Sequence, residues 1–163
     1  MRRTAAVVGV VATMVLATAG VAVAESQTVP GTVDIDQMVA NNAQTEVRVR
    51  VDGMAAPCDT HFLHVAVNWR GPDLYRAEAG CYPGGVWAKS LVYHETADLQ
   101  NGTIVNCPGL VFRWNGINEF FKVVVPRSCL DQAPNRVRVS AEGHVYTSTQ
   151  SSEAGPTGFL ARG

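Results

Sequence analysis

Residues 46–52, EVRVRVD, alternate strictly between apolar and polar side chains. Val47, Val49 and Val51 fall on one side of an extended chain, and charged residues fall on the other. Because successive side chains of a β-strand point to opposite faces, this pattern predicts a strand with one buried face and one face in water. Such a strand needs a second layer that covers its apolar face.

Short segments of similar character recur along the chain, separated by turns rich in Gly, Pro and Asn. Turns are predicted at residues 115–118 and at Glu142–Gly143. A helix over residues 34–43 is the alternative to the first strand, and no other segment suggests an amphipathic helix. About 8–10 short strands of this kind are typical of an all-β fold, either an antiparallel β-sandwich or a barrel, and we expect the sandwich. The predicted strands cover residues 35–40, 46–52, 61–69, 74–80, 86–95, 103–106, 110–114, 119–125, 135–141 and 144–149.

The first 24 residues have the layout of a secretory signal peptide. A short cationic start is followed by a long uncharged stretch that ends in Ala22-Val23-Ala24, small residues suited to cleavage. An uncleaved membrane anchor is the alternative, since the apolar run is long enough to span a bilayer. We therefore expect a secreted, extracellular protein with a polar lead over residues 25–32, one domain over residues 33–149 and a flexible tail over residues 150–163.

Four cysteines in an exported chain indicate two disulfides. Each of the pairs Cys58 with Cys81 and Cys107 with Cys129 flanks two predicted strands that are joined by a short turn. Folding the two strands back on each other brings both cysteines of a pair to the same end, so we expect the bridges Cys58–Cys81 and Cys107–Cys129. The alternative is a zinc site with four cysteine ligands, but the chain lacks the C-x-x-C spacing typical of such sites.

The charge pattern argues against nucleic acid and against anionic membranes as partners. Without the two arginines of the leader, the chain contains 11 basic and 14 acidic residues, and no block of like charge occurs. We expect an unidentified protein or polysaccharide partner and no cofactor. The basic residues are spread over several predicted strands, at Arg48, Arg50, Arg113, Arg136 and Arg138.

Two histidines open one of the predicted strands, and they are the main candidates for a metal site. His61 and His64 are three residues apart, so in a strand they point to opposite faces, with His61 on the side of Leu63. A single metal ion therefore cannot be bound by both histidines at once. The favoured interpretation is that they are ordinary strand residues. A site completed by His94 or His144 from another strand is the alternative.

Catalysis has little support, because the chain has no G-x-S-x-G motif and no free thiol once its cysteines are paired. Aromatic residues offer another function. Trp69, Tyr75 and Trp114 could form a flat platform on which sugar rings stack, although large aromatic residues more often anchor a core. At least two of Trp69, Trp87, Trp114 and Tyr75 would have to be exposed and coplanar to act as a platform.

Several segments of the chain form a recognisable series: VDIDQMVANN followed by EVRVRV, NWRGPDLYRAEAG, NCPGLVFRWNGINEFFKVVVPRSCL and NRVRVSA. The most specific part is VPRSCLDQAPNRVRV. In this series the chain resembles a group of small secreted actinobacterial proteins. The resemblance covers about residues 33–140 and implies a β-sandwich and a Cys107–Cys129 bridge. This chain departs from the pattern at residues 72–75, PDLY, and in its additional pair Cys58 and Cys81. Because these proteins have no assigned function, the resemblance brings no catalytic residue with it.

The sequence thus favours a secreted, non-catalytic binding or interaction module, extracellular or associated with the cell wall. A carbohydrate-binding module that uses exposed Trp and Tyr residues is the first alternative. A small metal-dependent or hydrolytic secreted enzyme is the second.

Overall fold

A computed structural model describes residues 24–68, 74–95, 101–131, 133 and 135–163. The described residues form twelve strands and one short 3-10 helix, Arg127–Cys129. None of their helices is long and apolar enough to cross a membrane. The strands are β1 (Glu25–Pro30), β2 (Gln37–Asn42), β3 (Glu46–Asp52), β4 (Thr60–Asn68), β5 (Leu74–Tyr82), β6 (Val86–His94), β7 (Thr103–Val105), β8 (Val111–Asn115), β9 (Phe120–Pro126), β10 (Arg136–Val145), β11 (Ser152–Ala154) and β12 (Leu160–Ala161).

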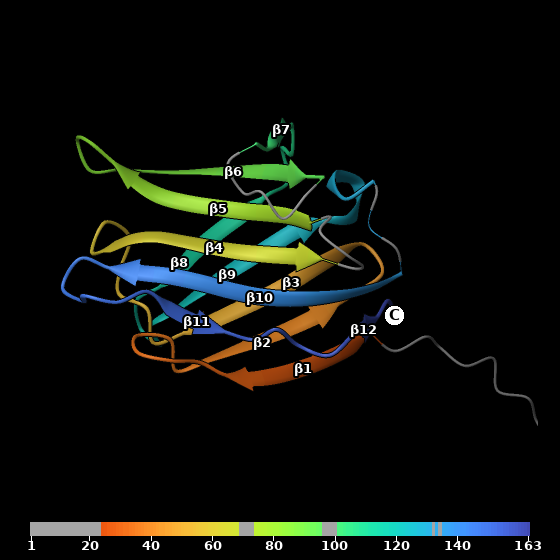
Figure 1. Cartoon of the computed structure of the whole chain (residues 1–163), viewed down its shortest axis with the longest axis horizontal. Helices are drawn as coiled ribbons and strands as arrows, with labels where there is room; N and C mark the ends of the chain where they lie inside the picture. The colour runs from red at the N-terminus through yellow and green to blue at the C-terminus, as the bar shows by residue number, and fades with distance from the viewer. Residues whose placement is uncertain (1–23, 69–73, 96–100, 132, 134) are drawn as a thin grey trace, which may run out of the picture.

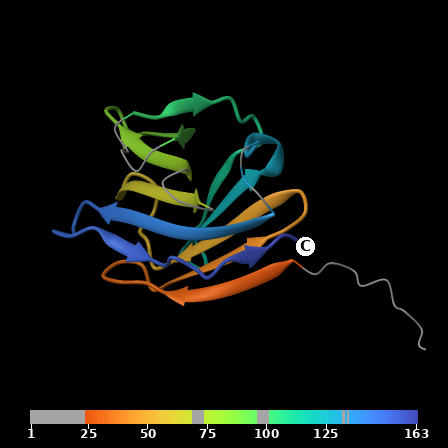
Figure 2. The same cartoon turned by 45° about the vertical axis from the view of Figure 1, so that its right-hand side comes forward.

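The strands build two antiparallel sheets that pack face to face, as Figure 1 shows. One sheet has five strands in the order β1-β2-β3-β9-β8. The other has seven, in the order β11-β10-β4-β5-β6-β7, with β12 paired to β10. The turned view in Figure 2 shows β11 and β12 between β10 and β1, at one side of the sandwich. The β-sandwich predicted from the sequence is therefore confirmed.

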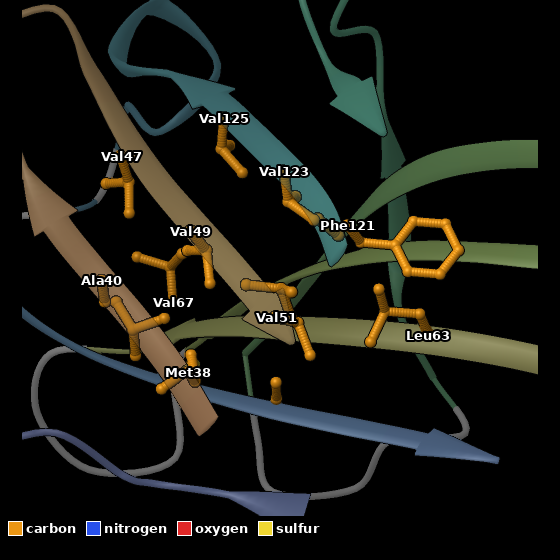
Figure 3. Packing of buried hydrophobic residues seen from close by; sticks show 14 of the residues in the cluster. Met38, Ala40, Val47, Val49, Val51, Leu63, Val67, Phe121, Val123 and Val125 are labelled. Carbon is orange, nitrogen blue, oxygen red and sulfur yellow. The ribbon is translucent and has the colours of Figure 1, made fainter. Parts of the chain in front are cut away.

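The core lies between the sheets, and valine is its most frequent residue. Val47, Val49 and Val51 of β3 are each at most 1 % exposed, as the alternation in EVRVRVD predicts. Leu63 and Phe121 meet them from β4 and β9, and both are fully buried (Figure 3). β-Branched side chains suit this arrangement, because they pack well on a pleated surface.

Both predicted disulfides are confirmed. Cys58–Cys81 joins the segment before β4 to the end of β5, with 5.0 Å between the Cα atoms. Cys107–Cys129 joins the segment before β8 to the 3-10 helix, with a Cα separation of 5.5 Å. Each bridge closes a hairpin unit, so each stabilises the fold by about 3 kcal/mol in the chain-entropy model. The zinc alternative is excluded, since no cysteine is free.

The predicted bounds of the domain, residues 33–149, are too narrow, because the polar lead and the tail both contribute strands to the sandwich. Residues 25–30 form β1, which pairs with β2. The chain after residue 150 forms β11 and β12, which both pair with β10, and Leu160 is 1 % exposed. The sequence did not reveal this role, because polar contacts hold the segment and leave no apolar period in it. The Asn42 side-chain amide donates to the carbonyl of Leu160, and the N–H of Gly158 donates to the side-chain oxygen of Gln27.

The predicted turn at Glu142–Gly143 is also wrong. Both residues lie inside β10, which continues without a break from Arg136 to Val145. A Cβ atom at Gly143 would lie 2.4 Å from the methyl carbon of Met54, so this glycine serves close packing and not a turn. Glycine inside a strand often marks such a close approach.

The C-terminal segment offers a direct test of its structural role. We expect Leu160→Ala to lower the free energy of unfolding by about 2–4 kcal/mol, because it removes a fully buried side chain. Phe159→Ala, at a neighbouring residue that is 37 % exposed, should cost well under half as much. Guanidinium unfolding of the oxidised protein measures both. Equal, near-zero effects would show that the segment is mobile after all.

Candidate functional site

The aromatic platform predicted at Trp69, Tyr75 and Trp114 is not formed by the residues that the structure describes. Tyr75 is 3 % exposed and packs on Tyr93, with 5.0 Å between ring centroids. Trp114 is half-buried and packs on Phe121 in the core, at 4.9 Å. Trp69 lies outside the described residues. Tyr75 and Trp114 therefore act as core residues, which removes the basis for stacking a sugar on them.

The two histidines of β4 occupy different surroundings. His61 is exposed, although strict alternation would turn it inward with Leu63. The pairing of β4 with β10 shifts between His144 and Val145, and this irregularity breaks the alternation at the start of β4. His61 Nδ1 lies 2.9 Å from the hydroxyl oxygen of Tyr146. The prediction that His61 shares a face with Leu63 is thus corrected.

A metal centre finds little support in this cluster. The ring centroids of His61 and His144 are 6.0 Å apart, so the alternative that included His144 is partly realised. His94 is 1 % exposed on β6 and takes no part. Within the described ranges no group of three or more His, Cys, Asp or Glu residues could hold a metal ion. Two imidazoles are fewer than the three or four protein ligands typical of zinc sites.

Three rings instead form a stack on the outer face of the seven-stranded sheet. Phe62 stacks on His64, with a centroid distance of 4.6 Å and an interplanar angle of 24°. His144, on the neighbouring strand β10, lies on the other side of Phe62, with a centroid distance of 5.9 Å and an interplanar angle of 17°. The register explains the arrangement, because Phe62 pairs with His144 across β4 and β10. The stack ends at His64, since the next outward residue of β4 is Ala66.

A hollow of about 210 Å³ begins where the stack ends. Its small residues are Ala66 and Ser140, which pair directly across β4 and β10. A volume of this size accepts one small ring, and it lies below the ~300–1,000 Å³ of typical drug-sized ligand pockets. The hollow is lined by His64, Ala66, Leu74, Arg76, Ser140 and Glu142.

The imidazole of His64 is neutral in this hollow. Burial is the main cause that lowers the pKa of His64 from 6.5 to about 4, and the nearby Arg76 guanidinium lowers it further against the opposing charge of Glu78. Its Nδ1 atom is buried and has no hydrogen-bond partner among the described residues. The nearest carboxylate oxygen, on Glu142, is 4.0 Å away, which is too long for a hydrogen bond. A buried polar atom without a partner costs free energy, so a ligand that supplies one is favoured.

The opposite wall of the hollow is held in place by an ion pair. Arg76 Nε donates to a carboxylate oxygen of Glu78, two residues further along β5. The hydroxyl of Ser90, on β6, lies 3.4 Å from the other oxygen of that carboxylate. Arg76 and Glu78 are only about a fifth exposed, so this pair is less screened than a surface pair. The side chains of this wall are therefore positioned by contacts within the fold.

Three other hollows among the described residues are larger but chemically less suited to a ligand. One, of about 400 Å³, lies beside β6 and β7, and its only charged side chain, Lys89, already donates to the carbonyl of Leu110. The second, of about 280 Å³, is at the C-terminus, where Arg162 donates to Asn135. The third, of about 250 Å³, lies beside β10 and β11 and includes Glu142 and Glu153 in its lining. None of the three is lined by a buried nitrogen atom that lacks a partner within the described ranges.

Sequence reasoning considered His64 but missed its partners in the hollow. Glu142 was predicted in a turn that does not exist, and Ser140 in the strand before that turn, without a partner. Arg76 was predicted only as one residue of an ordinary strand. The alternation in residues 74–80 does place Arg76 and Glu78 on one face. Their proximity to His64 depends on β4 lying between β5 and β10, which one sequence does not reveal.

Comparisons with known proteins add no relatives. No protein-family model matches the chain, and no curated protein sequence is significantly similar to it. The resemblance to small secreted actinobacterial proteins thus stays a prediction.

The lowered pKa of His64 predicts how stability depends on pH. The pKa is lower in the folded state than in the unfolded chain, so the unfolded chain binds more protons between pH 6.5 and about 4. The associated stability is complete above pH 6.5 and is lost as the pH falls toward 4. We expect the native protein to lose up to about 3 kcal/mol more than His64→Gln between pH 7.5 and 4. Guanidinium unfolding at both pH values measures this difference, and equal losses would contradict a buried neutral imidazole.

Proposed function

We propose that this protein is a secreted, non-catalytic binding module that takes one saccharide ring in the hollow beside His64. One observation carries the proposal. The buried Nδ1 of His64, which lacks a partner among the described residues, faces the Glu142 carboxylate at 4.0 Å. The stack of rings ends at His64, and the small residues Ala66 and Ser140 follow it. The space above these small residues is open to a ligand that contacts both His64 and Glu142.

The 4.0 Å separation suits a hydroxyl group. An oxygen placed about 2.8 Å from both atoms makes an angle of about 90° between them, which a hydroxyl tolerates. The hydroxyl donates its proton to the Glu142 carboxylate and accepts a hydrogen bond from the neutral His64 ring. A sugar ring provides such hydroxyls at its edge, and its C–H face can lie against His64 as the next member of the stack.

The same chemistry argues against hydrolysis. A general base works best when its pKa is near the operating pH, whereas the pKa of His64 is about 4. All four cysteines are in disulfides, so no thiolate nucleophile exists. A binding role therefore fits the site better than an enzymatic one.

The location outside the cell is part of the proposal. Disulfides form and persist in oxidising compartments, and this fold has two of them. The sequence pattern of residues 1–24 adds a secretory leader. Together they support a protein that meets extracellular or cell-wall polysaccharides.

Calorimetry on an oxidised chain that starts at Glu25 tests the proposal, since this chain contains every described strand. The probes are glucose, galactose, mannose, arabinose and N-acetylglucosamine, each at about 10 mM, which saturates even a site of millimolar Kd. We expect at least one sugar to bind. Glu142→Gln should weaken that binding about tenfold, because it removes a charge-assisted hydrogen bond. Ala66→Leu should abolish binding by filling the hollow.

Two matched variants control for unrelated damage. Glu153→Gln makes the same change at the residue that pairs with Glu142 on β11, and Ala88→Leu adds the same volume further along the same sheet face. Both should bind like the native protein. Equal weakening in the control variants, or no binding by any sugar, would contradict the proposal. Stabilisation by Zn²⁺ that requires His61 and His144 would replace it with a metal site.

A further inference from the structure

The outer face of the five-stranded sheet carries a row of cations that the sequence conceals. Because β3 turns its valines inward, Arg48 and Arg50 point outward. Strand pairing places Arg50 directly opposite Lys122 of β9, and Lys122 directly opposite Arg113 of β8. Three cations from three separate segments thus stand side by side across three adjacent strands, over about 10 Å.

Two of these cations have no acidic partner. Arg50 donates to Asp52 at 2.6 Å and lies over the ring of Phe120, 4.1 Å from its centroid. Lys122 and Arg113 are exposed, and neither forms an ion pair with any residue that the structure describes. The positive charge of the row is therefore only partly compensated within the fold.

Such a row carries a cost in the folded protein. Like charges directly opposite each other on neighbouring strands are destabilising, whereas opposite charges there stabilise the pair. The whole chain has a formal net charge of −1, so the row does not follow from a generally basic composition. A local conflict without a compensating contact is expected at functional sites, where a ligand relieves it.

The surroundings of the row suit a chain that has both charges and apolar faces. On one side the row is flanked by Phe120, and on the other by Val124 and Val111, which also pair with each other across β9 and β8. Phe120 and Val111 are half-buried, and Val124 is 8 % exposed. Val39 continues the row on β2. The cations are thus bordered by shallow apolar strips.

We propose that this face binds an extended acidic polysaccharide, with carboxylate or sulfate groups on Arg50, Lys122 and Arg113 and sugar C–H faces on the apolar strips. Strands fix the cations at regular spacing, which matches a polymer with regularly repeated charges. This site is on the opposite sheet from the His64 hollow and does not depend on it.

Other polyanions fit the face less well. Phe120 is the one aromatic side chain in the paired rows around the cations, and Arg50 lies over it, so bases find no stacking platform. The described residues contain no α-helix that could enter a nucleic-acid groove or lie in a membrane interface.

The test compares binding of the oxidised chain from Glu25 to polygalacturonate and dextran sulfate, with neutral dextran as the uncharged control. We expect both acidic polymers to bind, neutral dextran not to bind, and added salt to weaken the interaction. Arg113→Gln/Lys122→Gln should weaken binding about tenfold or more. Arg136→Gln/Arg138→Gln removes the same charge from the other sheet and should leave binding nearly unchanged.

Thermal unfolding of the same variants separates binding from folding. Since like charges are removed from adjacent positions, Arg113→Gln/Lys122→Gln should unfold at the native temperature or above it. Equal weakening by both double variants would overturn the proposal, because attraction would then follow net charge alone. Binding of duplex DNA or phosphatidylserine vesicles as tight as that of the acidic polysaccharides, with the same dependence on Arg113 and Lys122, would also overturn it.

Discussion

The two inner faces of the sandwich must bury alternate residues of every long strand, and the rest of the structure depends on this constraint. A shift of one residue in any strand would bring charged side chains into the core, so the register is tightly specified. Val49 pairs with Val123 at the centre of one sheet, and Val65 pairs with Ala141 in the other. Because side chains alternate along a strand, the inward residues also determine which residues point outward.

Both proposed surfaces are consequences of that constraint. Burial of Leu63 and Val65 turns Phe62, His64 and Ala66 outward, which creates a stack of rings followed by a gap. In the same way, burial of Phe121 and Val123 turns Lys122 outward between Arg50 and Arg113. The core thus consists mainly of apolar side chains, whereas both proposed binding sites lie on outer faces, one on each sheet.

The sequence predicted what depends on local period and on hairpin closure. The strand at residues 46–52 and both disulfides followed from these rules, because they need only neighbouring segments of chain. It failed where long-range pairing decides the outcome. Ser152 and Leu160 are buried where they form hydrogen bonds with Asp34 and Asn42, each 118 residues earlier in the chain, and where both pair with β10. Nothing in their local sequence indicates these contacts.

The site itself shows the same limit. His64 was visible as a candidate, yet Glu142 was assigned to a turn, and its distance from His64 follows only from the pairing of β4 with β10. Arg113 and Lys122 were scattered charges until β8 and β9 were paired. Trp114 and Tyr75 illustrate the converse, since their residue type suggested a binding role and their inward position made them part of the core.

A crystal structure of the oxidised protein soaked in the saccharide mixture would test the central claim most directly. The account predicts a single sugar ring beyond His64, with one hydroxyl between its Nδ1 atom and the Glu142 carboxylate. A ring bound elsewhere, at Trp114 for example, or a hollow filled by the protein's own side chains, would contradict it.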